Sequence, residues 1–439
     1  MSRVVSSAAP LYMAMIAASV AAVVDAAVLG NTSTAALAAF ALTGVVYFPA
    51  IATVTGAVRG VMPFVSSVGD DQAALRRVLG DGTWLSVSIG VVGAAAVASV
   101  PLLGRASGVP DATLDALGVF PWLMAGVVVL SSFGAMASSS LVGIGRSTVV
   151  MRAGLLGALT TMVLSPLLVL GLGPVPGLGL AGSGLALLVA YVATLSVNLL
   201  TLRRSLSFSI VGTLRRLPNV GRVLELAKVG IPMAGTVLVK FGVLGVVALA
   251  ASRVGTTAAA GHSIATTLVG LTFSASVAVG QAGIPLISER VNIGDLAGVR
   301  RAAIAGSIVA GAVVATLCAA LVVFDGPVAR LFSSDPEVLS LMPSLLPVVA
   351  VAIVADGLQA VVGFGLTGLK RTFPGFVISC VFYAVLAVVA LPVAQHFGVV
   401  GLWGAVAVVN VLLIVGRGVA MWRISAQLES RTAGRGTRA

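Results

Sequence analysis

The chain has 439 residues, of which 59% are hydrophobic and 9% charged, and its mean hydropathy is +1.13. These values exclude a soluble globular domain and indicate a polytopic helical membrane protein. The net charge of +12 raises nucleic-acid binding as an alternative. The basic residues lie in loops on one side of the predicted topology, so we expect no nucleic-acid partner.

Apolar runs long enough to cross a bilayer, bounded by charges or by Gly and Pro turns, predict twelve membrane-spanning helices. The fold class is therefore an all-α integral membrane protein. Two divisions rest only on short turns, at 173–179 and 396–398. The predicted spans cover residues 8–30, 38–66, 79–103, 117–140, 149–172, 178–202, 229–252, 259–288, 301–324, 341–368, 373–395 and 399–421.

The basic residues predict the topology. If both termini are cytoplasmic, 21 of the 26 lysines and arginines fall in cytoplasmic segments, and three, Arg105, Arg253 and Arg330, fall in outer loops. Because basic loops stay on the cytoplasmic side, we expect a multi-pass protein of the cell membrane with cytoplasmic N- and C-termini. Segment 203–228, between the sixth and seventh spans, reads as a solvated basic linker that can contact anionic lipid.

The two halves of the sequence repeat at an offset near 222. Four matches occur in the same order: Pro10 with Pro232, 31–39 with 253–261, GDDQAALRR at 69–77 with GDLAGVRR at 294–301, and LVGIGRST at 141–148 with LTGLKRTF at 366–373. The repeat predicts two six-helix bundles, 1–202 and 229–423, joined by the linker and followed by a disordered tail at 424–439. Two such bundles favour a transporter with its substrate cavity on the pseudo-twofold axis.

Four ionised residues stand clear of the span ends: Asp25, Arg59, Lys240 and Asp356. An acid at mid-membrane costs about 2.5–3.5 kcal/mol on insertion scales, so it usually faces a cavity, a partner or a proton route. Lys240 and Asp356 lie at similar depth and can pair, which would offset the cost of desolvating both. Asp25 has no basic partner at matching depth, so we predict that it couples transport to protons.

The remaining polar residues give weaker predictions. Gln281 and Gln359 lie on inward faces, where they either contact substrate or hydrogen-bond between helices. Thr161 and Ser165, near Pro166, are further cavity candidates or bond their own backbone. Arg59 is interpreted as a structural or snorkelling residue, and His262 as a helix-end histidine bonded to backbone. The two histidines and two separated cysteines form no metal-site or enzymatic motif, so we expect no enzyme activity, cofactor or metal.

The first span and its turn, PLYMAMIAASVAAVVDAAVLGNTSTAALAA, contain a proline, an acid and then G-x-x-x-T-x-x-L-A-A. This pattern resembles the first-helix signature of the multidrug and toxic compound extrusion (MATE) transporters. KVGIPMAGTVLVK, VGTTAAAGHSIA, LVGIGRST, LTGLKRTF and GVVGLWGAVAVV agree with it in order and spacing. The resemblance covers nearly the whole chain and is closer to the DinF-like branch, within the wider MOP flippase superfamily.

The resemblance implies a twelve-helix exporter with two lobes, alternating access, and coupling to protons or sodium. It makes Asp25 the first-helix proton site, Pro10 the point at which that helix bends, and Asp356 the tenth-helix acid of the second lobe. The chain departs from the family at two places. Thr161 and Ser165 stand where many relatives carry Asn and Asp, and Lys240 stands where the NorM-like and eukaryotic branches carry glutamate.

From these departures we hypothesise that Lys240 is a tethered cation beside Asp356, replacing an exchangeable ion and leaving proton coupling to Asp25. Sodium is disfavoured because an ammonium group opposes it. The expected function is proton-coupled export of small organic compounds by a monomer. One alternative is a lipid-linked precursor flippase, which would need more basic residues in its cavity. The other is a non-transporting scaffold or receptor, which the repeat and the buried acids disfavour.

Overall fold

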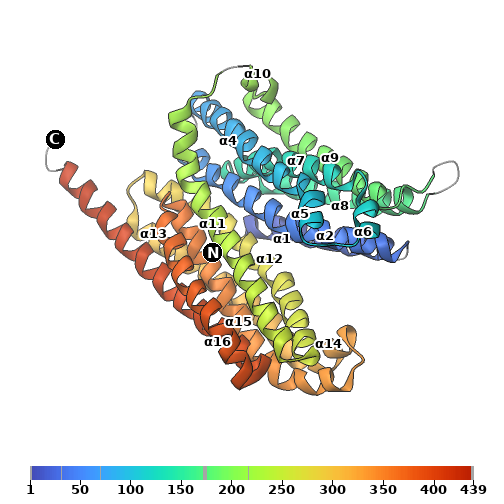
Figure 1. The fold of residues 1–439 in the computed structure, drawn as a ribbon. Helices are drawn as coiled ribbons and strands as arrows, with labels where there is room; N and C mark the ends of the chain where they lie inside the picture. The colour runs from blue at the N-terminus through green and yellow to red at the C-terminus, as the bar shows by residue number, and fades with distance from the viewer. Residues whose placement is uncertain (1, 31, 70, 172–175, 216, 437–439) are drawn as a thin grey trace. The chain divides into compact units, whose positions relative to one another are not determined.

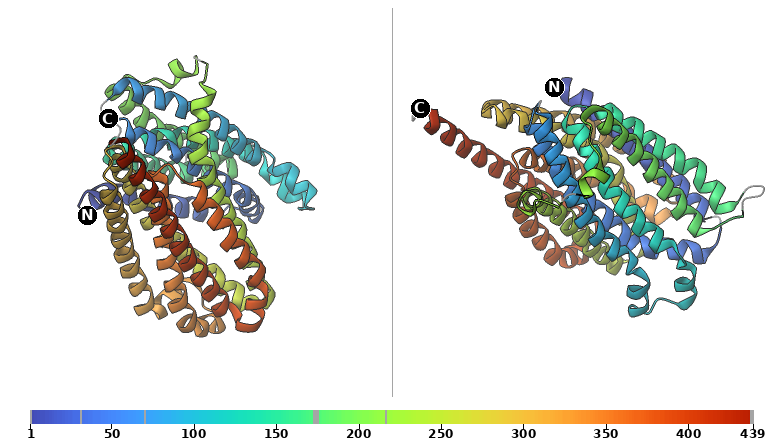
Figure 2. Two further views of the ribbon diagram at one scale, coloured as in Figure 1. Left: turned by 90° about the vertical axis from the view of Figure 1, so that its left-hand side faces the viewer. Right: turned by 90° about the horizontal axis from the view of Figure 1, so that it is seen from above.

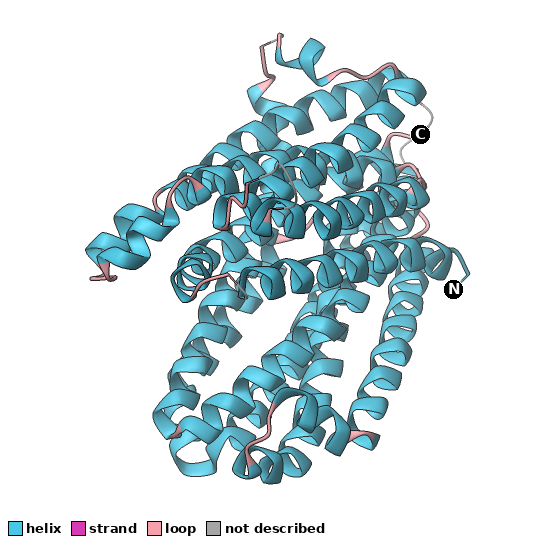
Figure 3. Cartoon of the chain, turned by 90° about the vertical axis from the view of Figure 1, so that its right-hand side faces the viewer, coloured by secondary structure: helices cyan, strands magenta, loops and turns pink. Residues whose placement is uncertain are grey.

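The computed structural model describes residues 2–30, 32–69, 71–171, 176–215 and 217–436, and these ranges are helical and contain no strand (Figures 1 and 3). The long helices are α1 Ser2–Gly30, α2 Thr34–Val58, α4 Gln72–Ala98, α7 Phe120–Gly143, α8 Ser147–Leu170, α9 Leu180–Leu206, α11 Val220–Val254, α12 Thr256–Asn292, α13 Leu296–Val323, α15 Pro336–Gly368 and α16 Phe373–Gly436. The short ones are η1 Arg59–Val61, α3 Met62–Ser67, α5 Val100–Ala106, α6 Asp111–Leu117, α10 Ile210–Leu214 and α14 Asp325–Phe332.

Eleven helices in the described ranges are long and apolar enough to cross a membrane, and the last of them holds two spans. Gly398 interrupts α16 with φ 65° and ψ −164°, a conformation that only glycine adopts at little cost. This break lies at the turn predicted for 396–398. The other weak division separates α8 from α9, although residues 172–175 are outside the described part. The predicted twelve-span all-α fold is confirmed.

Several boundaries differ from the prediction. The linker at 203–228 is partly helical, because α9 extends into it, α10 lies within it and α11 already begins at Val220. Helix α16 continues to Gly436, where a disordered tail is predicted from residue 424. The segment RISAQLESR in that region is rich in good helix formers, which explains the continuation.

The chain divides by its internal contacts into two lobes. The N-lobe is Pro10–Val237, and the C-lobe is Met1–Ala9 with Leu238–Ala439. Both divisions fall inside a helix, α1 and α11, so each of these helices belongs to both lobes. The predicted bundle boundaries at 202 and 229 remain predictions. Within the C-lobe, α12, α13, α15 and α16 pack against one another, as the left view of Figure 2 shows.

The shared helices are fixed by close packing on each side of the division. At the start of α1, Val4 and Ala8 are buried in a cluster with Val279 and Ala310 of the C-lobe. In α11, a Cβ added at Gly230 would lie 2.0 Å from the carbonyl oxygen of Ala57 in α2. Glycine therefore lets the α2 and α11 backbones touch, the kind of approach that holds helices together in lipid.

The repeated G-D motifs cap equivalent helices. Asp71 accepts hydrogen bonds from the backbone N–H groups of Ala73 and Ala74 at the start of α4. Asp295 accepts one from Gly298 at the start of α13, 2.7 Å away. The backbone N–H of Ala74 is the main cause that lowers the pKa of Asp71, and that of Gly298 the main cause for Asp295, where Arg290 lowers the pKa further.

Candidate functional site

The acid of the N-lobe, Asp25, lies in the C-terminal part of α1, five residues before Gly30, and is 2% exposed. Ser183 of α9 donates a hydrogen bond of 2.8 Å to one carboxylate oxygen, and Ser165 of α8 donates a short hydrogen bond to the other. Within the described ranges no lysine, arginine or histidine lies within ion-pair distance of Asp25. Its charge is therefore balanced only by hydroxyl dipoles.

Asp25 lines a cavity of about 460 Å³ whose lining residues all come from N-lobe helices. The wall is mostly apolar and aromatic, with Phe40, Phe48 and Phe120 among its members. Tyr47 and Tyr191 also line it, and their side chains hydrogen-bond to each other. Several small residues, Ala18, Ala21, Ala22, Gly154 and Gly157, leave the space open.

Thr161 lines the same cavity, but its hydroxyl donates a hydrogen bond of 3.2 Å to the carbonyl of Gly157 in its own helix. Ser165, four residues further along α8, instead reaches Asp25. The structure thus brings Asp25, Thr161 and Ser165 together, as predicted for cavity candidates, and adds Ser183. Their roles in transport stay predictions.

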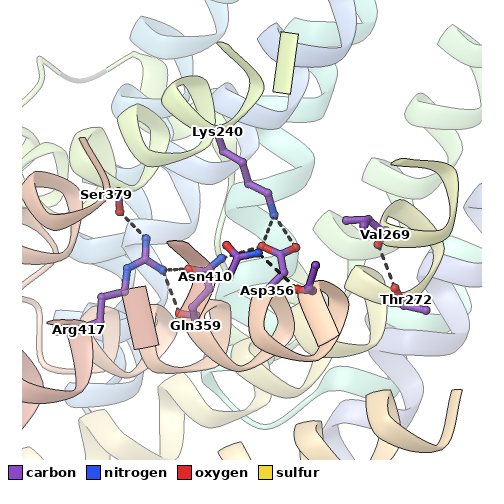
Figure 4. A network of polar contacts seen from close by, with 9 residues as sticks. Lys240, Val269, Thr272, Asp356, Gln359, Ser379, Asn410 and Arg417 are labelled. Atoms are coloured by element: carbon purple, nitrogen blue, oxygen red, sulfur yellow. Dashed lines mark hydrogen bonds and ion pairs between the residues drawn. The ribbon is translucent and has the colours of Figure 1, made fainter. Parts of the chain in front are cut away.

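The C-lobe holds the predicted pair of charges. The Lys240 ammonium lies 2.7 Å from both carboxylate oxygens of Asp356, and their side chains are 20% and 4% exposed (Figure 4). Lys240 also lies 3.9 Å from the centroid of the Phe273 ring, a cation–π contact. Gln359 donates to one Asp356 oxygen at 2.9 Å. Asp356 is thus held by an ammonium group and an amide within the C-lobe.

A buried arginine, Arg417, extends this group of contacts through Gln359. Arg417 of α16 is 4% exposed, donates to the backbone carbonyl of Gln359 at 2.9 Å and makes a short hydrogen bond to its side-chain oxygen. It also donates to the Ser379 hydroxyl at 2.6 Å. Arg417 therefore orients the amide of Gln359 so that its NH₂ group faces Asp356, as Figure 4 shows.

The topology predicted from the sequence counts Arg417 among its 21 cytoplasmic basic residues, whereas the structure buries the side chain within the C-lobe. The residue lies near the end of the last span, where an arginine normally reaches the membrane surface. Its position one helical turn from the end gave no sign that it turns inward. The spacing of small residues on α15, with Gly363 against the Arg417 guanidinium, is the only signal we find.

The other predicted residues lie outside both groups. Gln281 on α12 is half-buried and takes no part in the Lys240 network. Arg59 sits in the 3₁₀ turn η1, also half-buried. Pro10 lies inside α1, which runs from Ser2 to Gly30 without interruption, so bending there stays a prediction. His262 is buried and shares a contact with the Thr266 hydroxyl on its own helix.

The comparisons with known proteins agree with this architecture. The MatE family model matches residues 232–393. The probable multidrug resistance protein NorM of Bradyrhizobium diazoefficiens is 28% identical over 395 residues, covering 86% of this chain and 84% of that protein. The protein of the same description from Pseudomonas aeruginosa is 27% identical over 444 residues and covers 97% and 90%.

Two solved structures share the fold along almost the whole chain. A MATE crystal structure in complex with MaL6 has a TM-score of 0.87 at 19% identity and covers 98% of this chain and 97% of that one. A MOP superfamily transporter from Pyrococcus furiosus, described as having a binding pocket of reverse polarity, has a TM-score of 0.84 at 20% identity, with 97% and 96% covered.

The matched relatives carry the NorM name, and the DinF-like branch stays a prediction. Along most of its length the chain is similar in sequence to relatives described as probable multidrug resistance proteins and in fold to solved MATE structures, and the MatE family model matches it at residues 232–393.

Proposed function

We propose that this transporter exports small organic compounds in exchange for protons and that Asp25 binds the coupling proton. One observation carries the proposal: Asp25 is a buried carboxylate on a cavity wall, held by two hydroxyls and by no cation in the described part of the chain. Such a carboxylate is not committed to an ion pair and can exchange a proton with the cavity that it lines. Asp356, by contrast, is already neutralised by Lys240.

Proton binding would change how α1 is tied to its neighbours. The ionised carboxylate accepts hydrogen bonds from Ser165 and Ser183. A protonated carboxyl group is itself a donor, so one serine hydroxyl must rotate to accept. The proton therefore rearranges the contacts of α1 with α8 or α9 at the cavity wall. This is a local change that a substrate in the same cavity can oppose or favour.

The cavity indicates the kind of cargo. Its volume of about 460 Å³ is in the range of sites for drug-sized molecules, and its wall is apolar and aromatic with a few polar groups. We infer an amphipathic organic compound, a drug or a natural product. The relatives described as probable multidrug resistance proteins support this class of cargo.

Lys240 supports protons over sodium. Its ammonium lies 2.7 Å from both oxygens of Asp356, and its positive charge opposes the binding of a sodium ion beside that carboxylate. We infer that this tethered cation stands in for an exchangeable ion in the C-lobe. It then braces the lobe, while the exchangeable charge is confined to Asp25.

We further propose that the protein lies in the cell membrane as a monomer, with both termini cytoplasmic. Removing buried Arg417 from the 21 cytoplasmic basic residues leaves twenty against three in the outer loops. The asymmetry remains large, and it is what supports this orientation.

The decisive experiment compares variants in proteoliposomes with an imposed pH gradient. We expect Asp25→Asn to abolish gradient-driven efflux of a fluorescent amphipathic substrate, and Lys240→Ala to reduce it. Ser131→Ala is the control, since this buried hydroxyl donates to its own helix at the carbonyl of Val128. Gradient-driven efflux at the wild-type rate in the Asp25→Asn protein would refute the proposed coupling site.

A further inference from the structure

A second cavity in the N-lobe, unrelated to Asp25, lies where the linker between the lobes folds onto α4. Its volume is about 580 Å³. One side is a single face of α4, and the other is formed by the end of α9, by α10 and by the start of α11. Arg76, Arg77, Asp81 and Trp84 line it from α4, and Arg222 lines it from α11.

The cavity carries excess positive charge. Three arginines face it against one aspartate, Asp81, which gives a formal excess of two charges among its lining residues. Asp81 interacts electrostatically with Arg77 and Arg222, but no ion pair within 4 Å joins them in the described ranges. Two neighbouring acids, Asp71 and Glu225, lie outside the lining. Asp71 is already occupied with capping α4.

The arginines are held so that their terminal nitrogens are available. The Nε of Arg76 donates to the carbonyl of Gln72 at 3.2 Å, and that of Arg77 to the carbonyl of Ala73 at 3.3 Å. These bonds fix the stem of each side chain against its own helix. The planar Nη fork is the part of arginine that binds a phosphate with two hydrogen bonds.

The repeated motif of the C-lobe has two arginines, Arg300 and Arg301, at the positions that match Arg76 and Arg77. There Arg300 donates to Ser425 at 3.0 Å and stacks on Trp422, with 4.6 Å from the guanidinium carbon to the ring centroid. Arg301 lies 3.8 Å from Asp295. Those guanidinium groups have side-chain partners, although Arg301 also lines a cavity, of about 490 Å³, together with Arg3 and Arg290.

The linker exposes apolar side chains, of which Leu217 lines this cavity and Val211 and Val220 are next in sequence to lining residues. Val211 of α10 is 62% exposed, Leu217 is 96% exposed and Val220 is 64% exposed. Trp84, on the lining itself, is half-buried. A basic pocket bordered by a tryptophan and by exposed aliphatic groups, at the end of a membrane span, matches the boundary between lipid headgroups and acyl chains.

We propose that this pocket binds the headgroup of an anionic phospholipid, with the phosphate on Arg76, Arg77 and Arg222 and the acyl chains along the exposed linker. A soluble phosphate shares the same chemistry at the arginines. The lipid is favoured because Val211, Leu217 and Val220 would otherwise stand in water. The bound lipid fastens the linker between the lobes to α4.

Native mass spectrometry of the purified full-length protein tests the proposal by titration with phosphatidylglycerol and phosphatidylcholine of identical acyl chains. We expect phosphatidylglycerol to bind about tenfold more tightly or better. The triple variant Arg76→Gln, Arg77→Gln, Arg222→Gln should lose most of that preference. The matched control, Arg203→Gln, Arg204→Gln, Arg215→Gln, removes the same charge from exposed arginines outside the lining and should keep it.

Equal binding of the two lipids by the wild type, or an equal loss in both triple variants, overturns the proposal. A third measurement adds inorganic phosphate as a competitor. If phosphate displaces phosphatidylglycerol at equal concentration, the ligand is a soluble anion and the lipid assignment is wrong. If the triple variant fails to fold, the fluorescence of Trp84 in the wild-type protein provides a second test. Phosphatidylglycerol with brominated chains must quench its fluorescence, measured against Trp84→Phe, and no Trp84-specific quenching overturns the proposal.

Discussion

The two lobes place different chemistry at the same points of the repeat. At the offset of 222, Asp25 matches Val247 and Ala18 matches Lys240. In the N-lobe, Ala18 and Asp25 line a cavity. In the C-lobe, Val247 is 0% exposed within the apolar core, and Lys240 extends to Asp356. The matched positions thus hold a cavity-lining acid in the N-lobe, and an apolar core residue and a lysine paired with an acid in the C-lobe.

The largest effect is expected when an acid is placed at Val247, the position in the C-lobe that matches Asp25. We expect Val247→Asp to prevent folding or to lower the free energy of unfolding by about 4 kcal/mol or more, because it buries a carboxylate in a cluster of mostly apolar side chains. Asp25→Val should fold, with only two serine hydroxyls left without an acceptor. Thermal unfolding in detergent measures both. A stable Val247→Asp protein would mean that the lobes are more alike than their packing indicates.

The second prediction compares the loss of unfolding free energy when one member of the Lys240–Asp356 pair is replaced with the loss when both are replaced. Asp356→Leu leaves the Lys240 ammonium without its carboxylate and should cost about 3 kcal/mol of unfolding free energy. The double variant Lys240→Met, Asp356→Leu should recover to within about 1 kcal/mol of wild type. A double-mutant cycle from denaturation curves checks this. If the double variant is as unstable as the single one, the pair contributes more than mutual neutralisation.

A smaller effect concerns the hydroxyls around Asp25. Ser165→Ala or Ser183→Ala removes a donor to the ionised carboxylate, so the protonated form is favoured. The midpoint of the pH profile of efflux should move about one unit to higher pH. Asn at Ser165 or Ser183 restores a donor and should return the midpoint toward wild type. An unchanged midpoint in both alanine variants would separate Asp25 from the rate-determining proton step.

The smallest effect compares the two capping aspartates. Their folded pKa values are lowered from 3.8, so their stabilisation is present above that pH and is lost as the pH falls through the folded pKa. Asp71→Asn and Asp295→Asn should therefore flatten the acid side of a melting-temperature profile. Asp295→Asn should have the larger effect, because Arg290 adds to its backbone bond. The reverse order would contradict the ion-pair contribution.

The sequence was sufficient for the parts of the fold that depend on hydropathy and charge. Run lengths predicted the twelve spans, and the depth of Lys240 and Asp356 in their spans predicted their pairing. Ser183 could not be found in this way. Span boundaries do not determine how a helix is rotated about its axis, and only packing brings α9 hydroxyls to α1. Arg417 was missed for the same reason, since an inward and a surface-reaching arginine look alike near a span end.

Because α1 and α11 each belong to both lobes, the chain cannot be divided in the linker into two fragments that each keep all of their packing contacts. A fragment that ends in the linker keeps Val4 and Ala8 but loses Val279 and Ala310, against which they pack. The complementary fragment begins with Gly230 and loses Ala57, whose carbonyl it touches. Neither half of the duplication is therefore a closed packing unit. Reconstitution from two pieces requires both to be present while each one folds.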